Sequence, residues 1–187
     1  IDAGVKIEEG YDVYEEGVEK NYFCKRQDGS DFVAAVWPGY THFPDVLNPD
    51  ARKWFGEKYK RLTDAGIEGF WNDMNEPAIF YSEKHLKEVF EKMEDYKKMN
   101  LDVNTFFEMT GMIGSICNNP EDYASFYHNY KGKRYRHDQV HNLFGYYMTR
   151  SASEAFERYV PEKRILLFSR ASYIGMHRFG GIWQGDN

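Results

Sequence analysis

The sequence predicts an α/β fold in which parallel strands form a sheet or a barrel, and three apolar runs are the basis of this prediction. Each run has the length of a strand and ends in a charged or carboxamide side chain. The runs, with the polar residues that follow them, are 67–71 with Asn72 and Asp73, 164–169 with Arg170, and 180–185 with Asp186. Parallel strands present an active site at their carboxyl ends, so we expect these polar side chains to share one.

A helix is predicted over residues 48–64, before the first of these strands. Asn48 suits the N-cap, Pro49 suits the first helical position, and Asp50 places an acid in the first turn. Apolar side chains follow at helical spacing, namely Trp54, Phe55, Tyr59 and Leu62. Gly66 ends the helix, and the order of helix, glycine, strand and polar cluster is typical of a βα unit.

Two more helices are predicted further along the chain. Ser82 begins a pattern with one apolar and one charged face, which is typical of a surface helix. A second pattern starts at Asp138 and gives a long helix that ends before Pro161. Residues 100–137 are rich in turns and aromatic side chains, and we expect an insertion near 79–137.

Composition narrows the class of protein. The 187 residues are 42% apolar and 18% aromatic, which is enough for the core of one substantial domain. The net charge is −6 and the basic residues are scattered, so we expect neither nucleic acid nor an anionic membrane as a partner. Cys24 and Cys117 lie far apart and form neither a metal motif nor a disulfide framework, which favours a reducing, cytoplasmic compartment.

Two carboxylates at the ends of neighbouring strands suit the cleavage of a glycosidic bond. One would be ionised, to attack or stabilise the anomeric carbon, and the other protonated, to release the leaving oxygen. The two groups need unlike environments. Asn72, Asn75 and Glu76 add polar groups near Asp73, whereas apolar shielding after Trp183 would raise the pKa of Asp186 as an acid requires. The alternative is that both are capping or ion-pairing acids, because the chain has 30 acidic residues.

Five sequence blocks occur in one order along most of the chain. They are WPG with FPDVLNP at 37–49, WNDMNEP at 71–77, HNLFG at 141–145, SRA at 169–171 and WQGDN at 183–187. The second block resembles the active-site signature of glycoside hydrolase family 31, the α-glucosidases, and the other blocks resemble that family in the same order. The form of this block favours glucose over xylose as the sugar.

The resemblance implies a (β/α)₈ TIM barrel, of which this chain is a part that carries a helical insertion. It implies that Asp73 is the nucleophile and Asp186 the general acid/base of a retaining mechanism, with no metal and no cofactor. Arg170 would bind the sugar near the acid. Four side chains would line the glucose pocket, namely Trp37, Trp71, Met74 and Trp183. The substrate would be an oligosaccharide that ends in α-linked glucose.

Three further candidates stay open at this stage. Glu76 would hold Asp73 or contact the sugar, or else form a local salt bridge. His137 and His141 are spaced like a metal pair, but without a third ligand we expect His141 to orient its neighbours and His137 to face solvent or the insertion. Asp2 follows what resembles another strand end and could line the pocket.

The resemblance also implies that the protein is longer than this chain. The remaining barrel strands and the flanking β domains would lie outside it, and the segment alone would be inactive. Two alternatives to an α-glucosidase remain: a carbohydrate-binding or structural segment without catalysis, and an α-transglucosidase of the same family. The linkage preference and the oligomeric state stay undetermined.

Overall fold

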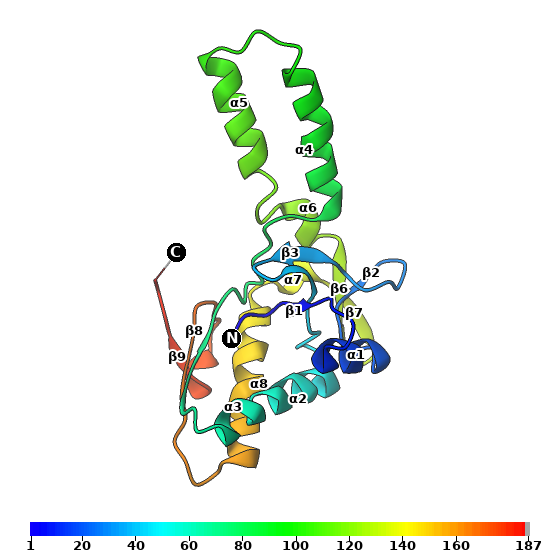
Figure 1. The fold of residues 1–187 in the computed structure, drawn as a ribbon. Coiled ribbons are helices and arrows are strands. Elements are labelled where there is room, and N and C mark those ends of the chain that lie inside the picture. Colours follow the sequence, from blue (N-terminus) through cyan, green and yellow to red (C-terminus); the bar gives the residue numbers. More distant parts are fainter. Residues whose placement is uncertain (186–187) are drawn as a thin grey trace.

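A computed structural model describes residues 1–185 and confirms the α/β class (Figure 1). Its parallel sheet has the order β5-β8-β9, with β5 at Gly69–Asn72, β8 at Leu166–Ser169 and β9 at Gly181–Ile182. Asp2 extends the series, because it forms a parallel bridge with Asp73. The three predicted strands therefore lie side by side and point the same way. In the part of the chain that is described, they do not close into a barrel.

The helices α2 (Pro49–Lys58) and α3 (Lys60–Asp64) precede β5 as predicted. The Asn48 side chain caps α2 by accepting a hydrogen bond from the Asp50 N–H at 3.0 Å. These two helices replace the single expected helix, because the Tyr59 N–H bonds the Gly56 carbonyl three residues back instead of four.

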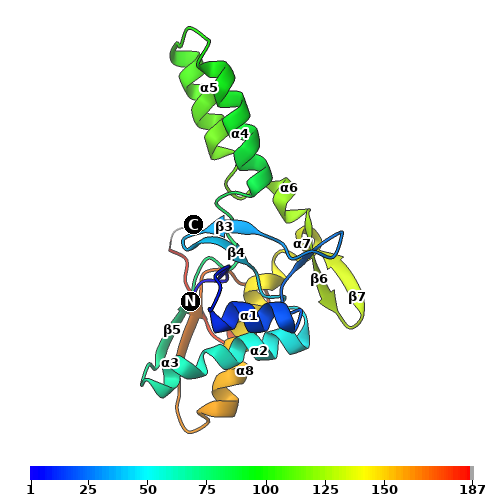
Figure 2. The ribbon, with the colours of Figure 1, turned by 45° about the vertical axis from the view of Figure 1, so that its right-hand side comes forward.

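The helix expected from Asp138 is also divided, into α7 (His137–Val140) and α8 (Leu143–Tyr159). The division falls at His141, whose carbonyl accepts a 3.1 Å bond from the Phe144 N–H in a three-residue turn. In Figures 1 and 2, α8 crosses the centre of the body and leads into β8. The Ser151 hydroxyl on α8 donates to the Arg52 carbonyl of α2 at 2.9 Å, which joins the two helices.

Two small antiparallel sheets form the rest of the body, and the sequence patterns did not predict them. One has the order β1-β4-β3, with strands Val5–Lys6, Gly39–His42 and Ala34–Val36. The other has the order β2-β6-β7, with strands Lys25–Arg26, Phe126–Tyr130 and Lys133–Arg136. Helix α1 (Asp12–Glu19) lies alongside α2 in both views (Figures 1 and 2).

Helices α4 (Glu83–Tyr96) and α5 (Val103–Gly114) form a hairpin that projects from the body (Figures 1 and 2). Ser82 caps α4 through its hydroxyl, as expected. The chain then returns to the body, where Phe126 and His128 of strand β6 are fully buried. The insertion near 79–137 stays a prediction, and only its α4–α5 part stands apart from the body.

The core is rich in aromatic side chains from segments that are distant in sequence. Phe32 stacks on Phe126 with ring centroids 4.3 Å apart, and Phe126 stacks on His137 at the same distance. Near the parallel sheet, Tyr59, Phe70 and Phe156 pack around one another. Within residues 1–185, no helix combines the length and the apolar character that crossing a bilayer requires.

Candidate active site

Asp73 is the residue that directly follows β5, at the carboxyl end of the parallel sheet. Its N–H donates to the Ile1 carbonyl at 2.9 Å, and its Oδ1 accepts from the Met74 N–H at 2.8 Å. Met74 has a φ of 54°, an uncommon conformation for a residue other than glycine, and it turns the chain sharply after the strand. The backbone of Asp73 is thus held by Ile1, and its carboxylate by the Met74 N–H.

Arg170 lies beside Asp73 because β5 and β8 pair in parallel with Asn72 opposite Ser169. Its Nε is 3.1 Å from Asp73 Oδ1 and 3.1 Å from Glu76 Oε1, so one guanidinium contacts both carboxylates. The Arg170 side chain is only 11% exposed, which strengthens these ion pairs. The structure therefore brings together Asp73, Glu76 and Arg170, three of the predicted site residues.

Polar side chains beneath this group were not singled out as site residues. Asn75 is fully buried, donates to the Ser169 hydroxyl at 2.9 Å and accepts from the Ala171 N–H at 3.1 Å. Asn72 is also buried and accepts a 2.6 Å bond from the Tyr59 hydroxyl. The bonds of Asn75 tie the loop after β5 to the end of β8 and the loop after it, and the bond of Asn72 ties β5 to the junction of α2 and α3. The sequence signal for these residues was the presence of two carboxamide side chains, Asn72 and Asn75, just after the apolar run 67–71.

The predicted pocket residues are divided between two places. Trp71 and Trp183 lie edge to face with ring centroids 5.8 Å apart, and Met74 Sδ is 3.0 Å from an Arg170 nitrogen. Trp37 is 74% exposed and packs against Phe80. Their role in lining a glucose pocket stays a prediction. Asp186 lies outside the described residues.

Asp2 places a further carboxyl group next to Asp73 through the parallel bridge between the two residues, and its role in the pocket stays a prediction. Burial raises the pKa of Asp2 above its ordinary value, and the neighbouring Asp73 charge raises it further. The pKa of a carboxyl group rises in this way when removal from water penalises its ionised form. The strand ends thus present two carboxyl groups and one guanidinium at one edge of the sheet.

A small open pocket of about 160 Å³ lies on the α8 side of Arg170. Glu76 and His141 line it together with Arg170, and Gly145 of α8 forms part of its wall. His141 thus stands next to the charged group as an orienting residue would. His137 was predicted to face solvent or the insertion. It does not face solvent, because it is fully buried, and its ring stacks on Phe126, which lies within the segment 79–137 where the insertion was expected.

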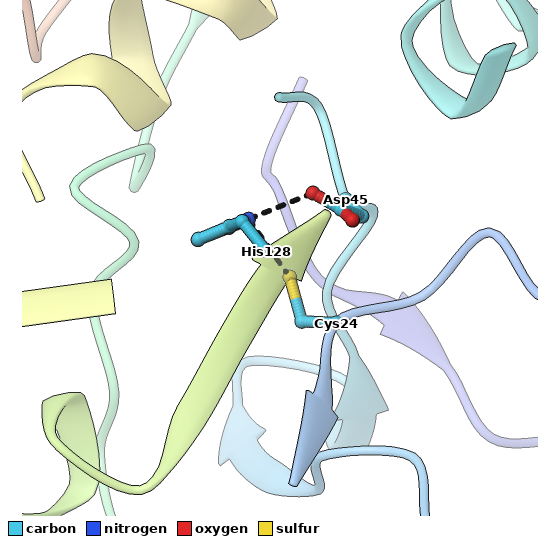
Figure 3. A group of neighbouring side chains, drawn as sticks. All are labelled: Cys24, Asp45 and His128. Carbon is cyan, nitrogen blue, oxygen red and sulfur yellow. Dashed lines mark hydrogen bonds and ion pairs between the residues drawn. The ribbon is translucent and has the colours of Figure 1, made fainter. Parts of the chain in front are cut away.

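Three buried side chains offer atoms of the kind that bind metals. They are Cys24, Asp45 and His128, whose ligand atoms lie within 4.8 Å of one another (Figure 3). They already bond to one another, since His128 Nδ1 is 2.9 Å from Asp45 Oδ1 and 3.5 Å from Cys24 Sγ. Burial raises the pKa of the Cys24 thiol well above its ordinary value, and the Asp45 charge raises it further. We interpret the group as a hydrogen-bonded cluster.

Comparison with known proteins decides the family. The model of the glycosyl hydrolases family 31 TIM-barrel domain matches residues 1–187. The chain belongs to this family. The family 31 barrel domain accounts for the parallel sheet, with Asp73 and Arg170 following two of its adjacent strands.

Curated relatives of this family 31 chain are several times longer. Alpha-glucosidase 2 of Bacillus thermoamyloliquefaciens is 33% identical over 187 residues, which are all of this chain and 19% of that protein. Alpha-glucosidase of Saccharolobus solfataricus is 29% identical over the whole chain, which covers 24% of that protein. The chain thus spans about a fifth of the length of these relatives.

Solved structures agree with the family. The glucosidase II alpha subunit matches the whole chain with a TM-score of 0.69 and 28% identity, and the match covers 17% of the subunit. A family 31 alpha-glucosidase from Bacteroides thetaiotaomicron matches with a TM-score of 0.62 and 27% identity, over 24% of its length.

Proposed function

We propose that the protein containing this chain is a retaining α-glucosidase that removes terminal α-linked glucose from oligosaccharides, with Asp73 as its nucleophile. The observation that carries the proposal is the position of Asp73 after β5, where Arg170 binds both Asp73 and Glu76. Membership of family 31 and similarity to proteins named alpha-glucosidase support the reaction class. Arg170 orients the Asp73 carboxylate, and Glu76 orients Arg170.

The reaction would proceed in two displacements. Asp73 attacks the anomeric carbon while the glycosidic C–O bond breaks, and the carboxylic acid of Asp186 gives its proton to the leaving oxygen. The resulting ester of Asp73 is then cleaved by water, whose proton returns to Asp186. In retaining enzymes the two carboxyl groups are about 5 to 5.5 Å apart. Glucose leaves with the α configuration of the substrate.

The segment alone is proposed to be inactive. A barrel of this type has eight strands, whereas the described residues supply β5, β8, β9 and the bridge at Asp2. Activity is therefore to be measured on the full-length protein.

Replacement of the nucleophile tests the function. Asp73→Asn keeps the size of the side chain but removes the attacking oxygen anion, and we expect kcat/KM for nitrophenyl α-glucoside to fall by about 10⁴-fold or more. Asp28→Asn removes a carboxylate from an exposed turn and serves as the control, with unchanged rates. Equal rates for Asp73→Asn and the unaltered protein would contradict the assignment of Asp73.

The same assay distinguishes the alternatives. Maltose as substrate gives free glucose in hydrolysis, but longer oligosaccharides if a sugar replaces water as the acceptor. A protein that binds maltose and releases no product from either substrate would be a carbohydrate-binding module, and this would contradict the proposed function.

A further inference from the structure

Three histidine rings connect a buried carboxylate with the edge of the active site. His128 Nδ1 is 2.9 Å from Asp45 Oδ1, and His128 Nε2 is 2.9 Å from His137 Nδ1. His137 Nε2 is in turn 3.0 Å from His141 Nδ1. His141 lines the pocket that also contains Glu76. We refer to Asp45, His128, His137 and His141 as the histidine chain.

The histidine chain is closed to water along most of its length. His128 and His137 are fully buried, and Asp45 is 1% exposed. Its members come from the loop before α2, from β6, from α7 and from the turn after α7. Water does not compete for these ring nitrogens. The hydrogen bond between two neighbouring rings therefore determines which nitrogen of each ring carries the proton.

Asp45 determines the direction of these hydrogen bonds. Its Oδ2 accepts from the Asn129 N–H at 2.7 Å, and its Oδ1 faces His128 Nδ1, which must therefore donate. A neutral imidazole carries one N–H, so His128 Nε2 accepts from His137 Nδ1–H. By the same rule His137 Nε2 accepts from His141 Nδ1–H. His141 Nε2 is then left unprotonated.

The opposite direction is unfavourable. It would place the lone pair of His128 Nδ1 against Asp45 Oδ1 at 2.9 Å, with two buried acceptors facing each other. An additional proton on His137 or His141 is disfavoured as well. Burial lowers the pKa of His137 well below its ordinary value, and its two histidine neighbours lower it further. Burial also lowers the pKa of His141, against the opposing effect of Glu76.

We propose that Asp45, His128 and His137 are positioning residues that hold His141 neutral, with an unprotonated Nε2 at the edge of the active site. In this state His141 accepts a hydrogen bond from a hydroxyl group in the pocket. This effect on the reaction rests on the proposed function, whereas the direction of the hydrogen bonds does not.

Titratable groups adjoin the histidine chain at both of its ends. Tyr123 packs edge to face on His141, and Glu76 acts on it from the loop after β5. Arg170 lines the same pocket, and Cys24 adjoins His128 at the other end. We therefore expect a replacement of Asp45 to change the protonated nitrogen of His141 through the hydrogen bonds between the histidine rings.

The direct test is the ¹⁵N NMR spectrum of the full-length protein with labelled histidine rings, assigned by single replacements. We expect His128, His137 and His141 to carry their proton on Nδ1, the rarer form of free histidine. In Asp45→Asn the new amide would donate to His128 Nδ1, and all three rings should change to Nε2–H together. A protonated Nε2 on His141 in the unaltered protein would overturn the proposal without any variant.

Asp122→Asn is the matched control. Asp122 is 4% exposed and lies 3.0 Å from Nδ1 of the buried His85, but this pair is not part of the histidine chain. The control should change the His85 signals alone. An effect of Asp45→Asn confined to His128 would overturn the proposal.

A kinetic measurement tests the effect on the reaction. In Asp45→Asn, His141 would donate where it formerly accepted, and we expect kcat/KM to fall about tenfold with a shifted pH profile. Asp122→Asn should leave both unchanged. His137→Gln interrupts the histidine chain, so adding Asp45→Asn to it should have no further effect. Losses in kcat/KM that add in the double variant would overturn the kinetic role of the histidine chain. If the unaltered protein had no glucosidase activity, only the proposed function would be contradicted.

Discussion

Arg170 shows how one side chain organises the site. Its guanidinium is nearly buried between Asp73 and Glu76, which come from the turn after β5. A planar guanidinium binds two carboxylates in fixed directions, which a lysine ammonium does not. Glu76 pairs with Arg170, so the salt bridge that was the alternative for Glu76 is present, and its role in holding Asp73 stays a prediction.

Arg170→Lys tests this arrangement. Because the ammonium cannot contact both carboxylates in the same geometry, we expect kcat/KM to fall by about 10²-fold. Arg61→Lys alters a guanidinium that pairs with Asp12 at an exposed position, and its rates should match those of the unaltered protein. If Arg170→Lys retained full activity, the geometry of the guanidinium would be unimportant.

Part of the site follows from the sequence alone. Asp73 and Arg170 stand at the ends of apolar runs, and parallel pairing brings such ends together. The histidine chain does not follow from the sequence, because the bond between Asp45 and His128 joins segments 83 residues apart. Ring tautomers depend on neighbours that only the folded chain provides.

Helix α8 sets the position of the loop after β8. A Cβ on Gly145 would lie 2.7 Å from both Cβ and the carbonyl oxygen of Ala171. Only a glycine allows this approach, and Ala171 directly follows Arg170. The helix and the loop are therefore in direct contact at the site.

The replacement Gly145→Ala should move helix α8 and the loop after β8 apart. We expect a loss of about 1–3 kcal/mol in the free energy of unfolding, because the added methyl overpacks the contact, together with reduced kcat/KM. Gly111→Ala on α5 adds a methyl in open space and should stabilise the helix by up to about 1 kcal/mol. Thermal unfolding of the two variants measures the difference, and equal unfolding temperatures would contradict the close packing.

Helices α1 and α2 are joined by an ion pair with a defined pH dependence. Burial acts to raise the pKa of Glu16, but hydrogen bonds from Lys20 and Lys58 outweigh it and lower the pKa from 4.5 to about 2. The unfolded state thus binds more protons between these values, and stability rises with pH.

Glu16→Gln removes this contribution. We expect a loss of up to about 1 kcal/mol above pH 4.5, diminishing as the pH falls from 4.5 toward about 2. Denaturant unfolding at several pH values measures it. A difference between the two proteins that does not change over this range would show that the carboxylate is not responsible.

Helices with clear capping signals were predictable, whereas helices α1 and α5 and the strands of the antiparallel sheets were not. Asn48 and Ser82 mark the starts of α2 and α4 through local capping bonds, which the sequence displays. Strands such as β1 and β2 have two residues each, and pairing with distant partners, not local pattern, defines them. The expected helix from Asp138 is divided at His141, where the Phe144 N–H bonds the carbonyl three residues back.

The described part of the chain combines the edge of a parallel sheet with a projecting hairpin. Asp73 and Arg170 follow two of the parallel strands, and α8 lies beside these strands (Figure 1). The hairpin exposes apolar side chains, with Phe106 and Phe107 both more than 60% exposed. These residues lie on α5, outside the core that supports the site.

Asp73 is proposed to form a covalent bond to the anomeric carbon of glucose. A fluorinated α-glucosyl fluoride, whose ester intermediate hydrolyses slowly, would be incubated with the full-length protein, which is then digested and examined by mass spectrometry. We predict one glucosyl label, attached to Asp73 in the peptide that contains WNDMNEP. A label on Glu76 or on another peptide, or turnover without any label and with inversion at the anomeric carbon, would contradict the account.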